Sequence, residues 1–331
     1  MVSAQLHYLV VPECDALVHE GDSPASRHLL PAGWQIGTLL TMTPPTYTPY
    51  DGSAKPFTIG LMPLDTDRWI EPDADWARYV GEKRALVESS RDDVFVAEAD
   101  TLDAQQEALD LLRQHLRERH PNLCPDVPDT GSDLPPLLRA GLMIQDDLVI
   151  MHRKQDGWHL VAGFVAFPSS WSLREKFGRP MHAIHADVPG FGEGTRNATL
   201  IHRIFDNLQV SQPVERLNWS VNTSNALFLP LSKHRRPPQA EPFTLADRFA
   251  RVERQTLRKL PRSGDILFTI RVYVDPISAI AHHPQAQSLA LSFAAQLESL
   301  DEHQAAYKGL SLQKRELAAK LHAFASNDRF T

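Results

Sequence analysis

The feature that most constrains the fold of this sequence is a tight turn between two strand-like runs. Residues 148–154 and 158–167 are rich in β-branched and aromatic residues, and Gln155-Asp156-Gly157 separates them. An Asp-Gly pair favours a two-residue hairpin because both central positions of that turn need positive φ angles. The two runs are therefore predicted to pair as antiparallel strands.

Two later segments, 249–257 and 265–275, have the period of two that is typical of strands. Polar side chains share one face of each segment: Arg251, Glu253 and Gln255 in the first, and Thr269, Arg271 and Tyr273 in the second. The opposite face of 265–275 is apolar. A further short strand is predicted over 57–63, where it ends at a proline.

Helical periodicity occupies other parts of the chain. The predicted helices cover 76–87, 101–120, 193–208 and most of 276–331. Ser172 and Glu175 form a capping-box pattern at the start of a short helix that Gly178 ends. Strands in hairpins with helices around them, without regular strand–helix alternation, predict an α+β fold.

The length of 331 residues suits one large domain. We expect a single domain over 1–331 that has three parts. Residues 1–55 are predicted to form an extended, proline-rich wrapping segment, 56–275 the core, and 276–331 a set of C-terminal helices.

Composition narrows the classes of function. A formal net charge of −7, spread along the chain, disfavours binding to nucleic acid. The two cysteines, Cys14 and Cys124, are too few for an iron–sulfur cluster and fit a reducing compartment. The N-terminus lacks the pattern of a signal peptide, and no apolar run is long enough to span a bilayer. A cytoplasmic protein without membrane association is expected.

Several motifs of well-known enzymes are absent from the sequence or out of context. The glycines between Gly190 and Gly194 lie in a predicted turn rather than between a strand and a helix, so they do not indicate dinucleotide binding. No phosphate-loop lysine and no nucleophile-elbow serine motif occurs. His182 and His185 lack further ligands at zinc-like spacing.

Charged residues inside apolar strands are the unusual feature of the centre of the chain. They occur in Arg216-Leu-Asn218-Trp219, in 251–255 and at Arg271. One interpretation is a solvated sheet face with ion pairs. The other is a pocket in which arginines converge on an anionic ligand. Haem is one candidate for that ligand, because it combines an apolar disc with two propionates and needs a neutral imidazole.

Longer motifs carry a resemblance to a known family. They are 162–180, 184–190, 216–220, 251–261 and 267–273, and the pattern of 57–96 follows the same family. Together they resemble the haem-dependent oxidative N-demethylase alpha-subunit-like family. The resemblance implies a PAS-like antiparallel sheet that holds haem b. It also implies O2-dependent removal of a methyl group from a small, dimethylamine-like secondary amine, giving formaldehyde and the primary amine, with electrons supplied by separate flavin and iron–sulfur subunits.

On this resemblance the axial ligand of the haem iron is expected to be His185, with His182 and His159 as reserves. The stiff Val188-Pro189 segment that follows would help to fix the direction of the imidazole. Asp187 stands where related sequences often carry proline, which is a departure from the family pattern in this loop.

The remaining site residues are expected in three roles. The candidates for pairing with the haem propionates are Arg251, Arg254, Arg258 and Arg271, although strand alternation separates them. The candidates for the distal pocket are Arg216, Asn218 and Trp219, and those for binding a substrate ammonium are Glu193 and Glu253. A haem-binding sensor and a non-catalytic binding protein remain the alternatives to an enzyme.

Overall fold

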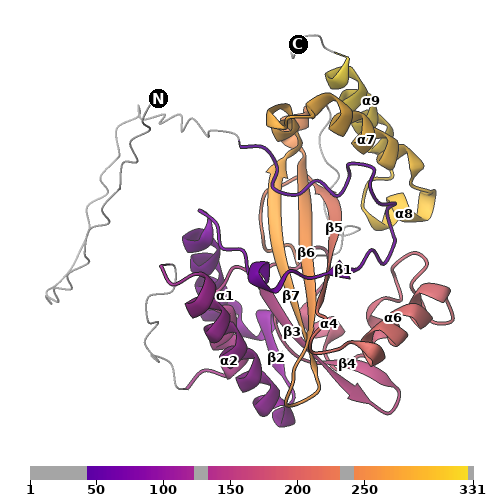
Figure 1. The fold of residues 1–331 in the computed structure, drawn as a ribbon. Coiled ribbons are helices and arrows are strands. Elements are labelled where there is room, and N and C mark those ends of the chain that lie inside the picture. Colours follow the sequence, from indigo (N-terminus) through magenta and orange to yellow (C-terminus); the bar gives the residue numbers. More distant parts are fainter. Residues whose placement is uncertain (1–42, 123–132, 232–241, 327–331) are drawn as a thin grey trace, which may run out of the picture. The chain divides into compact units, whose positions relative to one another are not determined.

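The fold is described from a computed structural model that covers residues 43–122, 133–231 and 242–326. Most of the predicted wrapping segment, 1–42, lies outside the described residues, as do both cysteines. The described residues form a mixed fold in which helices surround one antiparallel sheet (Figure 1). This arrangement confirms the α+β class.

The sheet has seven strands among the described residues, in the order β1-β5-β6-β7-β3-β4-β2. Their bounds are β1 (Met62–Pro63), β2 (Phe95–Ala97), β3 (Asp147–Lys154), β4 (Gly157–Phe164), β5 (Val214–Asn222), β6 (Phe249–Lys259) and β7 (Ile266–Pro276). All pairings are antiparallel. The predicted hairpin between β3 and β4 is confirmed, because Lys154 pairs with Gly157. Its two turn residues are Gln155 and Asp156 rather than Asp156 and Gly157, and of these three only Gly157 has a positive φ, of 139°, so the expected turn with two positive φ angles does not form.

The helices are α1 (Trp76–Val94), α2 (Leu102–Arg119), α3 (Pro136–Gly141), α4 (Leu173–Lys176), α5 (Met181–Ile184), α6 (Arg196–Asn207), α7 (Ala286–Ser299), α8 (Glu302–Tyr307) and α9 (Lys314–Ala325). Short 3-10 turns are η1 (Thr66–Arg68), η2 (Ala99–Thr101), η4 (Leu245–Asp247) and η5 (Ile277–His282). All four predicted helical regions are confirmed. None of the described helices is long and apolar enough to cross a membrane.

Strand register divides the side chains between two faces of the sheet. Asn218 pairs with Glu253, and Arg216 pairs with Gln255, so these four side chains share a face that we call face 1. The opposite face, face 2, carries Arg254 and its neighbours at alternate positions. The two faces are covered by different helices, and this difference positions the candidate site.

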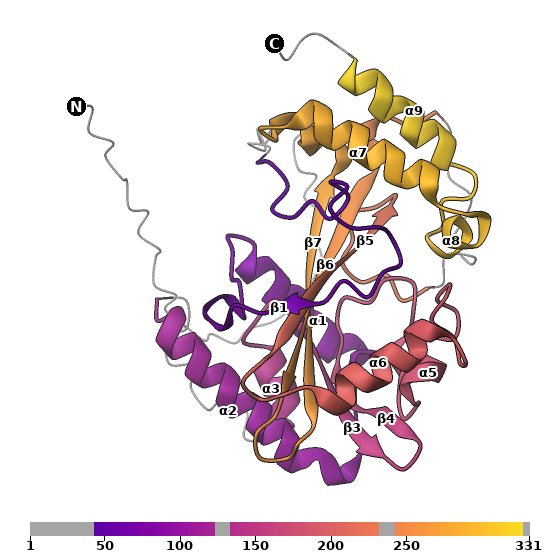
Figure 2. The same ribbon diagram turned by 45° about the vertical axis from the view of Figure 1, so that its right-hand side comes forward.

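Face 2 is covered at both ends of the sheet. At one end Leu148 and Ile150 pack with Leu109 of α2, and at the other end Trp219 and Val252 pack with residues of α7 and α9. Figure 2 shows α7 and α9 at the end of the sheet opposite to α2. Each cluster consists of residues buried to more than nine-tenths, so burial of apolar surface holds these helices in place.

Face 1 is covered mainly at the end formed by β3 and β4. There Val149 and Met151 pack with Met181 of α5 and Phe205 of α6. Farther along the face, Arg251, Ile270 and Val272 are buried, and other side chains are half-buried: Arg216, Asn218, Glu253, Gln255, Phe268 and Val274. Face 1 therefore has a partly open surface of mixed polarity next to α5.

Three expectations about the elements need correction. The strand predicted over 57–63 contains only Met62 and Pro63, because Phe57 and Gly60 adopt positive φ angles of 59° and 58° that interrupt the extended backbone before Met62. Ser172 stands at the N-cap of α4, but its side chain makes no capping hydrogen bond. The helix predicted from 193 begins at Arg196, because the Thr195 hydroxyl caps it by accepting from Ala198 N at 3.2 Å.

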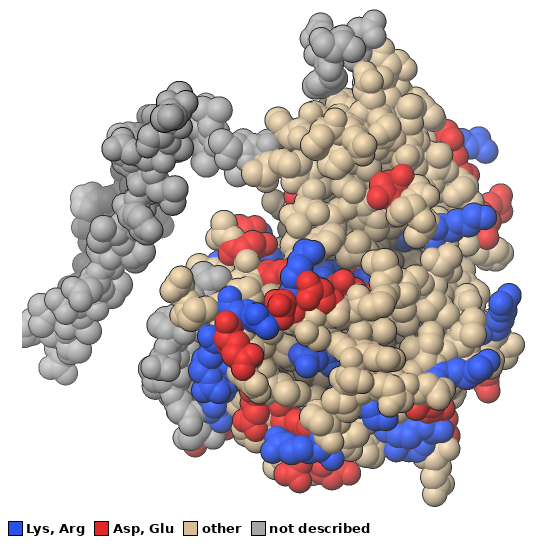
Figure 3. Space-filling view, viewed as in Figure 1, with Lys and Arg blue, Asp and Glu red and all other residues tan. Residues whose placement is uncertain are grey.

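The interpretation of a solvated, ion-paired sheet face is wrong for the solvation of three strand arginines, although Arg254 and Arg271 are ion-paired with Glu215 and Asp73. Arg251, Arg254 and Arg271 are exposed to only 0%, 2% and 1%. Charged side chains that do lie at the surface are interspersed in sign on the face shown in Figure 3. Some surface charges are paired, as in the 2.6 Å contact of Arg119 with Asp67.

A buried lysine ties α1 to the start of β3. Lys83 is fully buried and its Nζ donates to the carbonyl oxygens of Gly141 and Ile144, each at 3.1 Å, and to that of Asp146. It also lies 3.8 Å from a carboxylate oxygen of Asp147. Burial lowers the pKa of Lys83 to about 8 and raises that of Asp147 to about 6, and each charge partly offsets the shift of the other.

Replacing this lysine tests how much the buried contact contributes to stability. Lys83→Met leaves three buried carbonyls without a donor and Asp147 without its cation, so we expect a loss of about 3–5 kcal/mol in the free energy of unfolding. The matched control, Arg84→Met, changes an exposed neighbour on the same helix and is expected to stay within about 0.5 kcal/mol of wild type. Urea denaturation measures both, and equal stabilities would contradict this account.

Candidate functional site

A row of polar side chains on face 1 is centred on Glu253. This polar row consists of Arg216, Asn218, Glu253 and Gln255. Its Oε2 accepts hydrogen bonds from Asn218 Nδ2 at 3.3 Å and from Gln255 Nε2 at 2.9 Å. Both donors are neutral amides, and in the part of the chain that the structure describes no cation lies within 4 Å of this carboxylate. The half-buried carboxylate is thus held in place while its negative charge stays available to a ligand.

Arg216 lies beside Glu253 in the same row. Its Nη2 donates to the carbonyl oxygen of Thr58 at 3.3 Å, but its Nε is buried without a hydrogen-bond partner among the described residues. Burial lowers the pKa of this guanidinium, and the negative charge of Glu253 opposes that shift. A buried donor without an acceptor is uncommon in proteins, and it indicates a missing acceptor at this point.

His185 follows directly after α5 and is half-buried. Its Nδ1 lies 3.0 Å from the carbonyl oxygen of Met181. Because a carbonyl can only accept, Nδ1 carries the proton, and in the neutral ring Nε2 then keeps its lone pair. Burial lowers the pKa of His185, and the nearby charges of Arg216 and Lys176 lower it further, although the bond to Met181 opposes them.

The backbone before His185 is held from both sides. Lys176 Nζ donates to the carbonyl oxygen of Ile184 at 2.8 Å, and Pro180 pairs with His159 in an isolated bridge. A shallow hollow lined by Met181, Phe191 and His202 lies beside the ring, between α5 and α6. The imidazole therefore has a fixed direction and a free Nε2, as ligation of a metal requires.

The structure does not bring the four arginines predicted for the propionates to one place. Arg254 and Arg271 lie on face 2, where Arg254 Nη2 contacts Glu215 at 2.6 Å and Arg271 Nη2 contacts Asp73 at 2.5 Å. Arg258 lies on the same face with its guanidinium 4.1 Å from the centre of the Trp69 ring. Arg251 is on face 1, but its Nη2 donates to Phe167 O at 2.5 Å and its Nη1 to Leu227 O at 3.2 Å.

Other predicted residues are also placed away from the row. Trp219 lies on face 2, where it meets the ring of Phe293 edge-on at 5.3 Å. Glu193 is exposed in the loop before α6. His159 has both ring nitrogens engaged, one at 2.9 Å from Gly178 O and one at 2.8 Å from Asp156 Oδ1, so neither is free for a metal. His182 remains on α5, with its ring 6.3 Å from that of His202.

One residue near the row was missed by the sequence analysis. Burial, and then the negative charges of Glu253 and Asp187, raise the pKa of Tyr307 to about 12, while Arg216 lowers it. Tyr307 therefore interacts electrostatically with Glu253 and Arg216 on the sheet and with Asp187 in the loop after α5. Nothing in the apolar periodicity of 276–331 distinguishes this tyrosine, because its position depends on how α8 packs against β5.

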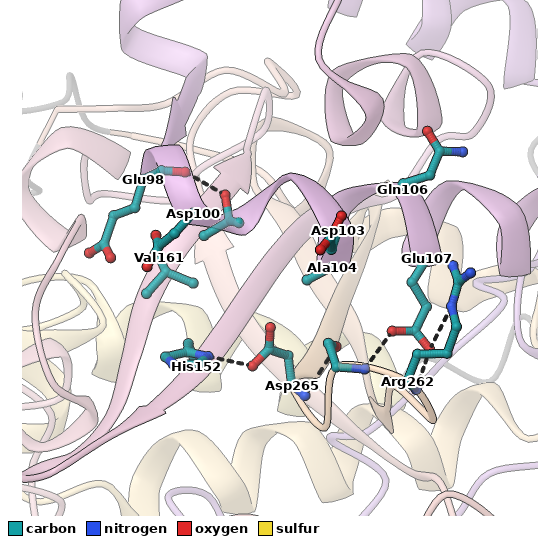
Figure 4. A pocket seen from close by; sticks show the side chains of 12 residues that line it. Glu98, Asp100, Asp103, Ala104, Gln106, Glu107, His152, Val161, Arg262 and Asp265 are labelled. Carbon is teal, nitrogen blue, oxygen red and sulfur yellow. Dashed lines mark hydrogen bonds and ion pairs between the residues drawn. The ribbon is translucent and has the colours of Figure 1, made fainter.

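A larger cavity, of about 490 Å³, lies elsewhere in the described part of the chain (Figure 4). Its walls come from η2, the start of α2 and the β6–β7 loop, and its acidic residues are Glu98, Asp100, Asp103, Glu107 and Asp265. Such a wall repels an anionic ligand. The carboxylates that point inward are also engaged, as where Glu107 accepts from Arg262 N at 2.6 Å and Asp265 lies 2.6 Å from His152. The row on face 1 is therefore the stronger candidate site.

The electrostatic contact between the row and His185 can be measured without any ligand. We expect the pKa of His185 in the wild-type protein to lie below the ordinary histidine value of 6.5. Arg216→Ala removes a positive charge that lowers this pKa, so the pKa should rise. Arg203→Ala removes an exposed charge from α6 and should leave it unchanged. An NMR titration of the imidazole resonances measures all three, and equal shifts in both variants would refute this geometry.

The amino-acid sequence matches a known protein family. The family model described as haem-dependent oxidative N-demethylase, alpha subunit-like, matches residues 60–318. The match covers more than half of the chain and includes His185, the polar row of face 1 and Tyr307.

Proposed function

The chain belongs to the haem-dependent oxidative N-demethylase alpha-subunit-like family, and on this premise we propose that face 1 binds haem b and that the loaded protein removes a methyl group from a small secondary amine. The observation that carries the proposal is the pairing of a directed, neutral imidazole, His185, with a buried guanidinium, Arg216, that has an unsatisfied donor.

The sheet supports a PAS-like core. Its central five strands, taken in space, run β4-β3-β7-β6-β5, and the short helices α4, α5 and α6 occupy the connection between β4 and β5. That is the antiparallel order that the PAS-like interpretation requires. In this arrangement α5 delivers His185 toward face 1, where the half-buried surface lies.

The donor set fits a haem. The neutral Nε2 of His185 is suited to the iron, and Arg216 is suited to a propionate because its Nε lacks an acceptor. On face 1 of β7 the half-buried Phe268 offers an apolar contact to the ring, while Ile270 and Val272 beside it are already packed against the protein's own side chains. Bound haem supplies the reaction of O2 that oxidises the N-methyl group.

The chain's own residues orient the amine. A secondary amine is a cation at neutral pH, and the carboxylate of Glu253 is the anionic group of the row that has no protein cation within 4 Å among the described residues. Asn218 and Gln255 hold this carboxylate in one direction, so that an ammonium bound to it has a defined position. The alpha-subunit-like description indicates partner subunits, and we propose that these are flavin and iron–sulfur reductases.

An absorption spectrum of protein from haem-supplemented cells tests the cofactor and its ligand. We expect a Soret band in the wild-type protein, and its loss or displacement in His185→Ala. His182→Ala and His152→Ala are matched controls that should keep the wild-type band. A band that survives in His185→Ala but is lost in His182→Ala would identify His182 as the iron ligand instead of His185. The absence of a band in the wild type would overturn the proposal.

Formaldehyde release from dimethylamine tests the role of Glu253. Glu253→Gln keeps the shape of the side chain but removes its charge, so we expect KM to rise about tenfold, or about 1.4 kcal/mol, with the Soret band unchanged. Glu175→Gln, an exposed control in α4, should behave as wild type. A Soret band without formaldehyde release from methylamines would favour a haem-binding sensor over an enzyme.

A further inference from the structure

A hydrogen bond attaches the end of α8, one of the C-terminal helices, to β5 beside the polar row. Lys308, which follows α8, is only 5% exposed and its Nζ donates to the carbonyl oxygen of Trp219. The ammonium also lies 4.3 Å from the centre of the Trp219 ring and 5.0 Å from that of Phe57. Trp219 is the neighbour of Asn218 in β5, so this contact brings α8 to the edge of the candidate site.

The residues before β1 lie along the same edge of the candidate site as α8. In Figures 1 and 2 it passes beside α8 before it enters β1. Phe57 in this segment adopts a φ of 59°, a left-handed conformation that is strained for a residue with a side chain. Its ring meets that of Tyr307 edge-on at 5.8 Å, and the next residue, Thr58, accepts from Arg216.

These contacts place Tyr307 at the rim of the row. The side chain is 42% exposed, so one side of it faces solvent while the other packs on Phe57. The hydroxyl has no hydrogen-bond partner among the described residues. The charges that act on the phenol come from Glu253 and Arg216 on the sheet and from Asp187, two residues after His185. Because Tyr307 packs on Phe57 and the adjoining Thr58 accepts from Arg216, Tyr307 lies next to the end of the row that holds Arg216.

We propose that Tyr307 determines the size of ligand that the haem site accepts, by closing the edge of the polar row beside Arg216, where its ring packs on Phe57. This inference rests on the proposed function and adds a specificity-determining residue to it. The Tyr307 ring packs on Phe57, and the next residue, Lys308, attaches the end of α8 to β5, so the ring limits the width of the opening. Amines with methyl substituents pass it, and amines with larger substituents are rejected by the ring.

Binding of two iron ligands of different size tests this role without turnover. Ferric haem-loaded protein is titrated with imidazole and with 4-phenylimidazole, and the shift of the Soret band gives the two dissociation constants. In Tyr307→Ala we expect the affinity for 4-phenylimidazole relative to imidazole to rise about tenfold or more, the scale of discrimination that pocket size gives. Tyr307→Phe keeps the ring and should keep the wild-type ratio.

Further variants control for general damage to the fold. Leu312→Ala removes a side chain that is 89% exposed in the loop after α8 and should leave the ratio unchanged. Tyr307→Leu keeps an apolar contact with Phe57 and should raise the ratio, whereas Tyr307→Trp should lower it. An unchanged ratio in Tyr307→Ala and Tyr307→Leu, with the Soret band intact, would overturn the inference alone. No Soret band in the wild type would instead overturn the proposed function on which it rests.

Discussion

The register between β5 and β6 is the constraint on which the candidate site depends. Because Asn218 pairs with Glu253, every even position of β5 shares a face with the odd positions of β6. A slip by one residue would carry Glu253 to face 2 and bring Arg254 to face 1. The partners of Arg254 resist such a slip, since it bonds to Glu215 and to the carbonyl oxygens of Arg68 and Trp69.

The pairing of β5 with β6 therefore places two groups of charged residues on opposite faces of the sheet. On face 2, Arg254 is enclosed and bonded to protein oxygens, and Arg271 donates to Asp73 and to the Val272 carbonyl although its Nε has no partner among the described residues. These contacts hold η1 and the segment before α1 on the sheet. On face 1, Arg216 and Glu253 lie beside one another with bonding capacity left over. Unsatisfied polar groups cost stability, and proteins keep them chiefly where a ligand completes them.

Local patterns predicted much of the fold and part of the site. The hairpin of β3 and β4, the period of two in β6 and β7, and the helical regions follow from short-range chemistry, and His185, Arg216, Asn218 and Glu253 were among the predicted residues. The roles of the four propionate candidates depend on long-range partners such as Asp73 and Phe167, which no local pattern contains. Lys83 and Tyr307 were missed for the same reason, since their surroundings come from segments distant in sequence.

The shortness of β1 has a consequence for how the molecule avoids aggregation. β1 pairs only with Val214 and Glu215, so the rest of β5 is an edge strand. Exposed edges recruit strands from other molecules, and proteins protect them with charged side chains and covering loops. Here Lys308 occupies the Trp219 carbonyl, and the segment of Phe57 and Thr58 lies alongside. A chain that lacks the residues before 60 would expose this edge of β5. The segment before β1 therefore also keeps the protein soluble.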